Sequence, residues 1–256
     1  MLLSDLERAL APHGLNLIGA TTPEAYDARV PPAHALRPRV PGAQAVIVIG
    51  NGGGAFWTAY RAFCRRHPGH ESSPDPLDDY TRLVIEHAID GRYAVLYPFG
   101  FPSETVSFTC LAECAGLGRR SLVGVLVHPV FGPWIALRAA VAVPFAVTVP
   151  RPADGFDPCP GCVERSCIAA CPGGAVDDAG WDVGRCAVAR SAEPDPCAAR
   201  CHARWDCVIG RAHRYPPDAF QHHQTRARPA LLAAVTIPDG RAAPGRGPVP
   251  VRTPRA

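Results

Sequence analysis

The alternation of hydrophobic and polar positions divides the first part of the chain into short strands and amphipathic helices. Residues 45–50 read AVIVIG, a continuous apolar run that predicts a strand buried on both faces. Residues 51–54 interrupt that run with an asparagine and three glycines, and residues 56–65 continue as a helix. A second helix is predicted after Asp75, which would cap it, with Pro76 in its first turn.

Three further strands and one further helix are predicted before residue 150. The strands are expected at residues 93–97, 121–128 and 134–143, and the helix at residues 105–117. Residues 129–133 make a tight turn, so the two strands on either side should pair antiparallel. The predicted fold class is therefore α+β, with a sheet of mixed strand direction flanked by helices.

Eight of the eleven cysteines lie between Cys159 and Cys207. The first four read C-x2-C-x4-C-x3-C-P, close to the bacterial ferredoxin run but with x4 in place of x2. Closely spaced thiolates can wrap an iron–sulfur cluster, and the cysteine before the proline usually ligates a second cluster. We therefore predict two [4Fe-4S] clusters. The first is expected on Cys159, Cys162, Cys167 and Cys207, and the second on Cys171, Cys186, Cys197 and Cys201.

Other interpretations of the cysteines remain open. Zinc also binds four thiolates, although its usual pair of C-x2-C motifs is represented only once here. The last two intervals are x3 and x5 with no proline after Cys207, so the second cluster departs further from the ferredoxin spacing. A histidine that flanks the clusters could replace a thiolate if a cysteine lies too far away. The candidates are His202, His213, His222 and His223. Cys64, Cys110 and Cys114 are expected to be small core residues.

Composition and charge narrow the functional classes. A net charge of +3 on 256 residues gives no reason to expect a nucleic-acid partner. Residues 1–10 contain Asp5 and Glu7 and do not resemble a signal peptide, and the apolar stretch 134–149 contains Arg138 and is too short to span a membrane. We therefore expect a cytoplasmic protein, since free thiols also suit a reducing compartment.

Three regions follow from these patterns. Residues 1–150 form the predicted α+β domain, residues 151–223 a ferredoxin-like iron–sulfur domain, and residues 224–256 a disordered tail rich in arginine and proline.

Two stretches of the first domain resemble known cobalamin proteins. Residues 115–118 (AGLG) and 128–134 (HPVFGPW) resemble a segment of epoxyqueuosine reductases, which join a nitroreductase-like cobalamin domain to a two-cluster ferredoxin module. Residues 123–143 are more similar to the cobalamin-processing proteins of the methylmalonic aciduria and homocystinuria type C family. The resemblance covers residues 1–150 with the second family and roughly residues 90–210 with the first. It implies cobalamin contacts at Gly116, Gly118, Gly124, Val125, His128, Phe131, Trp134 and Arg138.

The chain departs from both families at positions that matter. Pro102 stands where epoxyqueuosine reductases carry a proton-donating aspartate, and Glu113 stands where the processing family has a histidine. The matching arginine in the processing family lies beside the corrin, where Arg138 could bind an anionic co-substrate.

The leading hypothesis is a cobalamin-binding reductase that passes electrons to the corrin cobalt, with a reductase or ferredoxin as electron donor. The alternatives are a ferredoxin-like electron carrier and a divergent epoxyqueuosine reductase relative that acts on another substrate.

Overall fold

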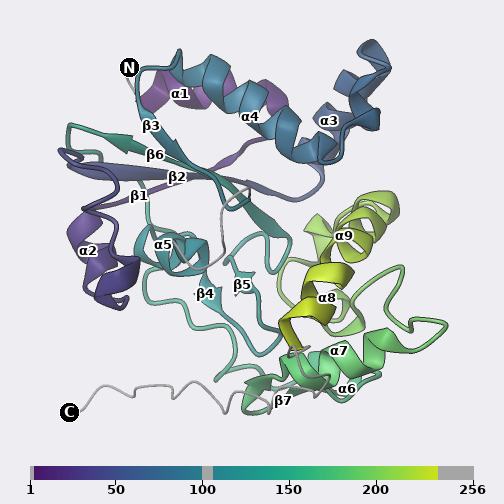
Figure 1. Cartoon of the computed structure of the whole chain (residues 1–256). Helices are drawn as coiled ribbons and strands as arrows, with labels where there is room; N and C mark the ends of the chain where they lie inside the picture. The colour runs from purple at the N-terminus through teal and green to yellow at the C-terminus, as the bar shows by residue number, and fades with distance from the viewer. Residues whose placement is uncertain (1–2, 100–105, 236–256) are drawn as a thin grey trace, which may run out of the picture.

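The computed structural model describes residues 3–99 and 106–235, and its centre is a four-stranded sheet between two layers of helices (Figure 1). The strands lie in the order β1 (Leu17–Thr21), β2 (Ala45–Gly52), β6 (Ile135–Val143) and β3 (Ala94–Leu96). The α+β class is confirmed, but the predicted mixed strand direction is wrong, because every pair in this sheet is antiparallel. Strand β6 lies between β2 and β3, which run in the same direction and would otherwise pair parallel.

The continuous apolar run of β2 is explained by helices on both faces of the sheet. Ala45, Ile47 and Ile49 face the core beneath the first helical layer, whereas Val46 and Val48 face the second core. The first layer contains α1 (Leu3–Leu10), α3 (Ala55–Arg66) and α4 (Pro76–Ile89), and the second contains α2 (Pro23–Asp27) and α5 (Phe108–Cys114). Alternate residues of a strand point to opposite faces, so both sets must be apolar.

Most predicted elements of this domain are confirmed. The helices expected at residues 56–65 and after Asp75 are α3 and α4, and the strand expected at residues 93–97 is β3. The helix expected at residues 105–117 is confirmed as α5, although residue 105 lies outside the described residues. Asp75 makes no side-chain capping bond to α4; it forms an ion pair with Arg226 at 3.0 Å instead. Short 3-10 helices complete the set at Ala11–His13, Pro32–His34, His70–Ser72 and Arg211–His213.

The predicted hairpin between residues 121–128 and 134–143 does not form as expected. Strand β5 (Leu126–Val127) pairs with β4 (Arg119–Arg120), while β6 pairs with β2 and β3. A bridge between His128 and Gly132 closes the turn itself, before the second segment begins. The left-handed backbone of Gly132 turns the chain away at that bridge, and the long strand β2 then offers β6 a better partner.

The cysteine-rich region contains short elements and one long helix. They are α6 (Ser166–Ala169), β7 (Val176–Asp177), β8 (Gly180–Trp181), α7 (Val183–Ser191), α8 (His202–Trp205) and α9 (Pro217–Val235). The prediction of a disordered tail from residue 224 is therefore wrong for residues 224–235, which belong to α9; residues 236–256 lie outside the described residues. None of the helices described here is long and apolar enough to cross a membrane.

Trp134 anchors the cysteine-rich region to the sheet. Its side chain is fully buried against Tyr215, Ala219 and Phe220, the last two on α9. Nearby, the loops at Gly132 and Gly210 approach so closely that a Cβ on Gly132 would lie 2.0 Å from the carbonyl oxygen of Ile209. Both glycines have a positive φ angle, so glycine is required at this crossing.

Candidate metal centres

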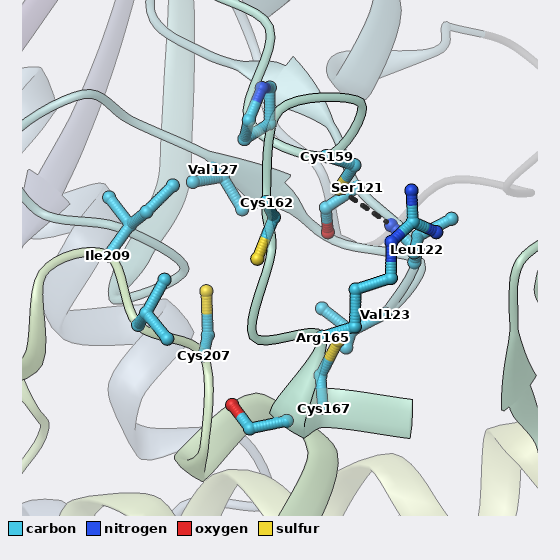
Figure 2. A pocket seen from close by; sticks show the side chains of 13 residues that line it. Ser121, Leu122, Val123, Val127, Cys159, Cys162, Arg165, Cys167, Cys207 and Ile209 are labelled. Carbon is cyan, nitrogen blue, oxygen red and sulfur yellow. Dashed lines mark hydrogen bonds between the residues drawn. The ribbon is translucent and has the colours of Figure 1, made fainter. Parts of the chain in front are cut away.

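Four cysteines from three separate segments line one small cavity. Figure 2 shows Cys159, Cys162, Cys167 and Cys207 around this space, together with apolar residues of the first domain. Cys159 and Cys162 lie in the loop before α6, Cys167 lies on α6, and Cys207 follows α8. The cavity has a volume of about 30 Å³, and Leu122, Val127 and Ile209 cover it.

Burial and hydrogen bonds act on these thiols in opposite directions. Burial raises the pKa of Cys159, Cys167 and Cys207, because a thiolate loses its hydration there. Backbone N–H groups oppose this rise: that of Leu122 donates to the Cys159 Sγ at 3.4 Å, and that of Ile209 lowers the pKa of Cys207. N–H donors directed at sulfur favour the thiolate over the thiol. The thiolate is the form that binds metals.

The other four cysteines line a second and much larger cavity. Cys171, Cys186, Cys197 and Cys201 share a space of about 390 Å³ with residues of β6, the β7–β8 hairpin and α9. The backbone N–H of Ala175 donates to the Cys171 Sγ at 3.3 Å, and the Trp181 side chain forms a hydrogen bond that lowers the pKa of Cys186. Burial raises the pKa of Cys197 to about 11. The same combination of buried sulfur and N–H donors therefore occurs in both cavities.

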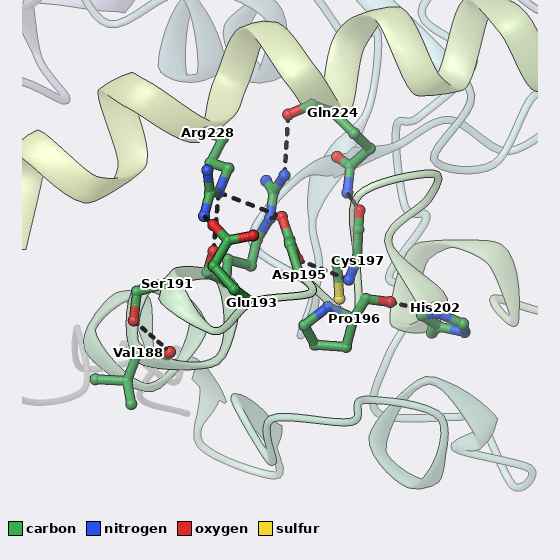
Figure 3. A network of polar contacts seen from close by, with 10 residues as sticks. Val188, Ser191, Glu193, Asp195, Pro196, Cys197, His202, Gln224 and Arg228 are labelled. Atoms are coloured by element: carbon green, nitrogen blue, oxygen red, sulfur yellow. Dashed lines mark hydrogen bonds and ion pairs between the residues drawn. The ribbon is translucent and has the colours of Figure 1, made fainter.

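A closed ring of polar contacts holds the backbone of Cys197 (Figure 3). Its N–H donates to the Asp195 Oδ1 at 2.7 Å, and its carbonyl accepts from the Gln224 side chain at 3.3 Å. Arg190 joins the two, with Nε 3.2 Å from Asp195 and Nη2 donating to the Gln224 carbonyl at 3.0 Å. Both side chains of the Arg190–Asp195 pair are about 5% exposed. Helix α9 thus fixes the loop that carries Cys197.

Arg228 extends this ring along α9. Its Nη2 lies 2.9 Å from a Glu193 carboxylate oxygen, and its Nε donates to the Arg190 carbonyl at 2.9 Å. The buried charges of Arg190 and Asp195 therefore pair with each other and are held by further polar contacts, as buried ions require.

The structure brings the cysteines together in the two sets expected from their spacing. In the part of the chain that the structure describes, however, no three histidine, cysteine or acidic side chains are close enough to hold a single metal ion. The thiols are therefore grouped by cavity, but they do not stand at the separations of one ion's ligands. Thiolates are soft donors that suit both zinc and iron–sulfur clusters. Of the histidines considered as substitutes, His202 and His223 line the second cavity.

The residues expected to contact cobalamin do not surround one cavity. Gly124 and Val125 line the second cavity, but a Cβ on Gly124 would lie 2.5 Å from the Trp181 ring. Gly116 is covered by Arg151, and Gly118 packs against Leu126 and Val127.

The other four predicted contacts have structural partners. His128 Nδ1 accepts from the backbone of Val130 and Phe131 at 3.0 and 3.2 Å, which shapes the turn. Phe131 packs against Gly52 and the His213 ring. Trp134 belongs to the core described above, and the Arg138 Nε donates to the Asn51 Oδ1 at 2.8 Å. Glu113, at the position that distinguishes the chain from the processing family, is buried and pairs with Arg29 and Arg120 at 3.5 Å.

Several residues of the site were missed from the sequence. Tyr215 lies just before α9 and Gln224 lies on it, and only Gln224 falls in the segment whose composition indicated a tail. A usable signal was the group of aromatic and histidine residues at positions 215–223, directly before that segment, which is unusual for a disordered chain. Cys64, Cys110 and Cys114 are buried in the two cores, as predicted.

The sequence matches no protein-family model and no curated protein. Among solved structures, the B12-trafficking protein CblC of C. elegans is similar with a TM-score of 0.58 and 13% identity, covering 90% of this chain and 93% of that protein. The expected resemblance to cobalamin-processing proteins is thereby confirmed for the fold.

Two larger proteins are similar over part of their length. Epoxyqueuosine reductase from Bacillus subtilis has a TM-score of 0.47 at 16% identity, covering 84% of this chain and 66% of that one. A catabolic reductive dehalogenase, solved with 3-bromo-4-hydroxybenzoic acid, has a TM-score of 0.46 at 15% identity. The match covers 96% of this chain and 41% of the dehalogenase. The chain thus spans about two thirds of the reductase and less than half of the dehalogenase.

Proposed function

We propose that this chain is a two-cluster iron–sulfur redox protein that delivers single electrons to a small acceptor beside its second cluster. The first cluster would be held by Cys159, Cys162, Cys167 and Cys207, and the second by Cys171, Cys186, Cys197 and Cys201. When bound, such clusters accept and release one electron at a time. The observation that carries the proposal is the separation of eight cysteines into two cavities of four.

The spacing of the cysteines supports a cluster in preference to zinc, because only one C-x2-C pair is present. N–H groups point at sulfur in both cavities. Hydrogen bonds to sulfur are among the features that tune cluster potentials.

The arrangement also suggests a direction of electron flow. Helix α6 carries Cys167, and Cys171 follows it within one turn, so one short segment links both cavities. Val163, next to Cys162, is 92% exposed, which places the first set of cysteines near the surface where an electron donor could dock. The second cavity is far larger than the first and leaves room for an acceptor.

Cobalamin is the second candidate, as the acceptor. The observation that favours it is the shared fold with a B12-trafficking protein over nearly the whole of both chains. The residues fit poorly, because only Gly124 and Val125 of the predicted contacts line the second cavity. Its volume of about 390 Å³ is also at the low end for drug-sized ligands, and a corrin is larger than these.

Anaerobic redox titration followed by electron paramagnetic resonance tests the first proposal. We expect two separate one-electron signals, and a protein without any reducible signal after reconstitution would contradict the proposal. Titration with hydroxocobalamin tests the second candidate, since binding shifts the cobalt spectrum. Val125→Phe is the variant to compare in the hydroxocobalamin titration. A bulky residue at Gly124 is unsuitable, because it would displace Trp181 whether or not cobalamin binds.

A further inference from the structure

Arg204 holds a positive charge at a fixed place on the wall of the second cavity. Its side chain lines that cavity together with Cys201 and the other three cysteines of the second set. The Arg204 Nε and Nη2 both donate to the carbonyl oxygen of Pro133, at 3.0 and 2.6 Å. Two hydrogen bonds to one oxygen hold the planar guanidinium in a single orientation.

Three aromatic rings surround the same guanidinium. Its central carbon lies 5.2 Å from the ring centroid of Trp134, 5.1 Å from that of Tyr215 and 5.5 Å from that of Phe220. The faces of such rings attract a cation, which offsets part of the cost of removing it from water. A ring carries no net charge, however, so these contacts keep Arg204 in place without cancelling its charge.

No carboxylate neutralises Arg204. Within residues 3–99 and 106–235 its hydrogen bonds are the two to Pro133, and no aspartate or glutamate forms an ion pair with it. Arg190, the other arginine of the cavity, pairs with Asp195 at 3.2 Å, so its charge is balanced. His223 is neutral, because burial lowers its pKa to about 3. Arg204 therefore gives the second cavity an unbalanced positive charge.

The surroundings of the first cavity differ in this respect. Among the described residues that line it, the one arginine is Arg165, which pairs with Asp178. The charge of Arg211 acts on Cys207, but Arg211 is exposed, and water and salt screen an exposed charge. The two sets of cysteines thus have the same ligand chemistry but different electrostatic surroundings.

The charge of Arg204 acts on the sulfurs of the second set. Burial raises the pKa of Cys201, whereas the backbone N–H and the positive charge of Arg204 oppose this rise. An added electron makes a cluster more negative, just as ionisation makes a thiol more negative. Because nearby charge is one of the features that set cluster potentials, a positive charge favours the reduced form and raises the reduction potential.

We propose that Arg204 sets the direction of electron flow, because its unpaired charge raises the reduction potential of the second cluster above that of the first. This order of potentials favours electron transfer from the first set of cysteines, near the exposed Val163, toward the larger cavity. The role rests on the two-cluster function proposed above. Arg204 acts through its field and is neither a ligand nor a catalytic residue.

Anaerobic redox titration of the reconstituted full chain, followed by electron paramagnetic resonance, tests this role. The signal that persists in Cys162→Ser identifies the second cluster, and in the wild type it should have the higher midpoint potential. Arg204→Met should lower the equilibrium constant for reduction of the second cluster by about tenfold, or about 59 mV for one electron, without moving the first. Arg204→Lys keeps the charge and should retain most of the wild-type value.

Arg214→Met is the matched control. The Arg214 Nε and Nη2 donate to the Trp205 carbonyl at 3.2 and 2.6 Å, and its guanidinium carbon lies 4.4 Å from the Trp205 ring. Arg214 thus makes the same kinds of contact as Arg204 but lines neither cysteine cavity. Arg214→Met should therefore leave both potentials in place. Equal decreases in the two methionine variants would reflect a general loosening of the fold and overturn the role of Arg204.

The remaining outcomes separate this role from the proposed function. Normal iron content with an unaltered second potential in Arg204→Met would overturn the role of Arg204 and leave the two-cluster function standing. A wild-type chain that takes up no cluster would contradict the proposed function, and the role of Arg204 would fall with it. If Arg204→Met does not fold, the wild type decides, because a second potential at or below the first contradicts the role.

Discussion

The cysteines differ in the cavity that each one lines, and the proposed ligand sets follow this division. Cys159, Cys162, Cys167 and Cys207 share one cavity, while Cys171, Cys186, Cys197 and Cys201 share another. The spacing of the cysteines predicted the same division that the cavities show, because in the ferredoxin run the cysteine before the proline usually ligates a second cluster. The contacts of Arg138 and Trp134 could not be predicted in this way, since both depend on α9 packing onto the sheet.

Single cysteine variants should separate the two clusters. Cys162→Ser removes a ligand of the first set, so its resonance signal should disappear while the second signal persists. Cys201→Ser should produce the reverse. Cys110→Ser, in the core of the first domain, is the control and should leave both signals in place. Loss of both signals in each ligand variant would instead indicate one shared site.

His223 should make the protein sensitive to acid. Its folded pKa is lowered to about 3 from an ordinary value of 6.5, by burial and by the charges of Arg138, Arg204 and His222. The unfolded chain therefore takes up a proton first as the pH falls. Stability is complete above pH 6.5 and declines toward pH 3, by at most about 1.4 kcal/mol per pH unit.

Denaturant unfolding between pH 7 and pH 4 measures this decline. His223→Gln should flatten the pH dependence, whereas His67→Gln, at an exposed position, should not. An identical slope in His223→Gln and the wild type would show that other groups determine the acid sensitivity.

Among the elements, α9 is the one that sequence patterns described least well. Proline and arginine indicated a disordered segment from residue 224, but α9 continues to Val235, and Gln224 binds the loop of Cys197. Tertiary contacts of this kind leave little trace in local composition. Strand β2 is the opposite case, because its unbroken apolar run predicted burial on both faces directly.

The ring around Cys197 should control both stability and the second cluster. Arg190→Gln breaks a buried ion pair and leaves Asp195 with Arg228 alone, whose Nε lies 3.5 Å away, so the cost should be about 2–3 kcal/mol, below that of a fully unpaired buried charge. It should also shift the midpoint potential of the second cluster without moving that of the first. Arg185→Gln is the control on the same helix, since its ion pairs are exposed and should contribute less than about 1 kcal/mol. Equal shifts in the midpoint potentials of both clusters would argue against a local effect of Arg190 on the second cluster.

For the whole molecule, the fold is shared with a B12-trafficking protein, but the function must be decided at the site. The proton-donating aspartate of epoxyqueuosine reductases is replaced by Pro102, which lies outside the described residues. We therefore expect no conversion of epoxyqueuosine in a tRNA anticodon stem-loop, measured by nucleoside analysis after incubation with the reduced protein. Turnover above the level of a cluster-free control would show that another group donates the proton.

The central claim is that each cavity holds an iron–sulfur cube, and elemental analysis tests it most directly. Protein purified and reconstituted without oxygen should contain about eight irons and eight acid-labile sulfides per chain. One or two zinc ions per chain, with no sulfide and no retained iron, would contradict the account.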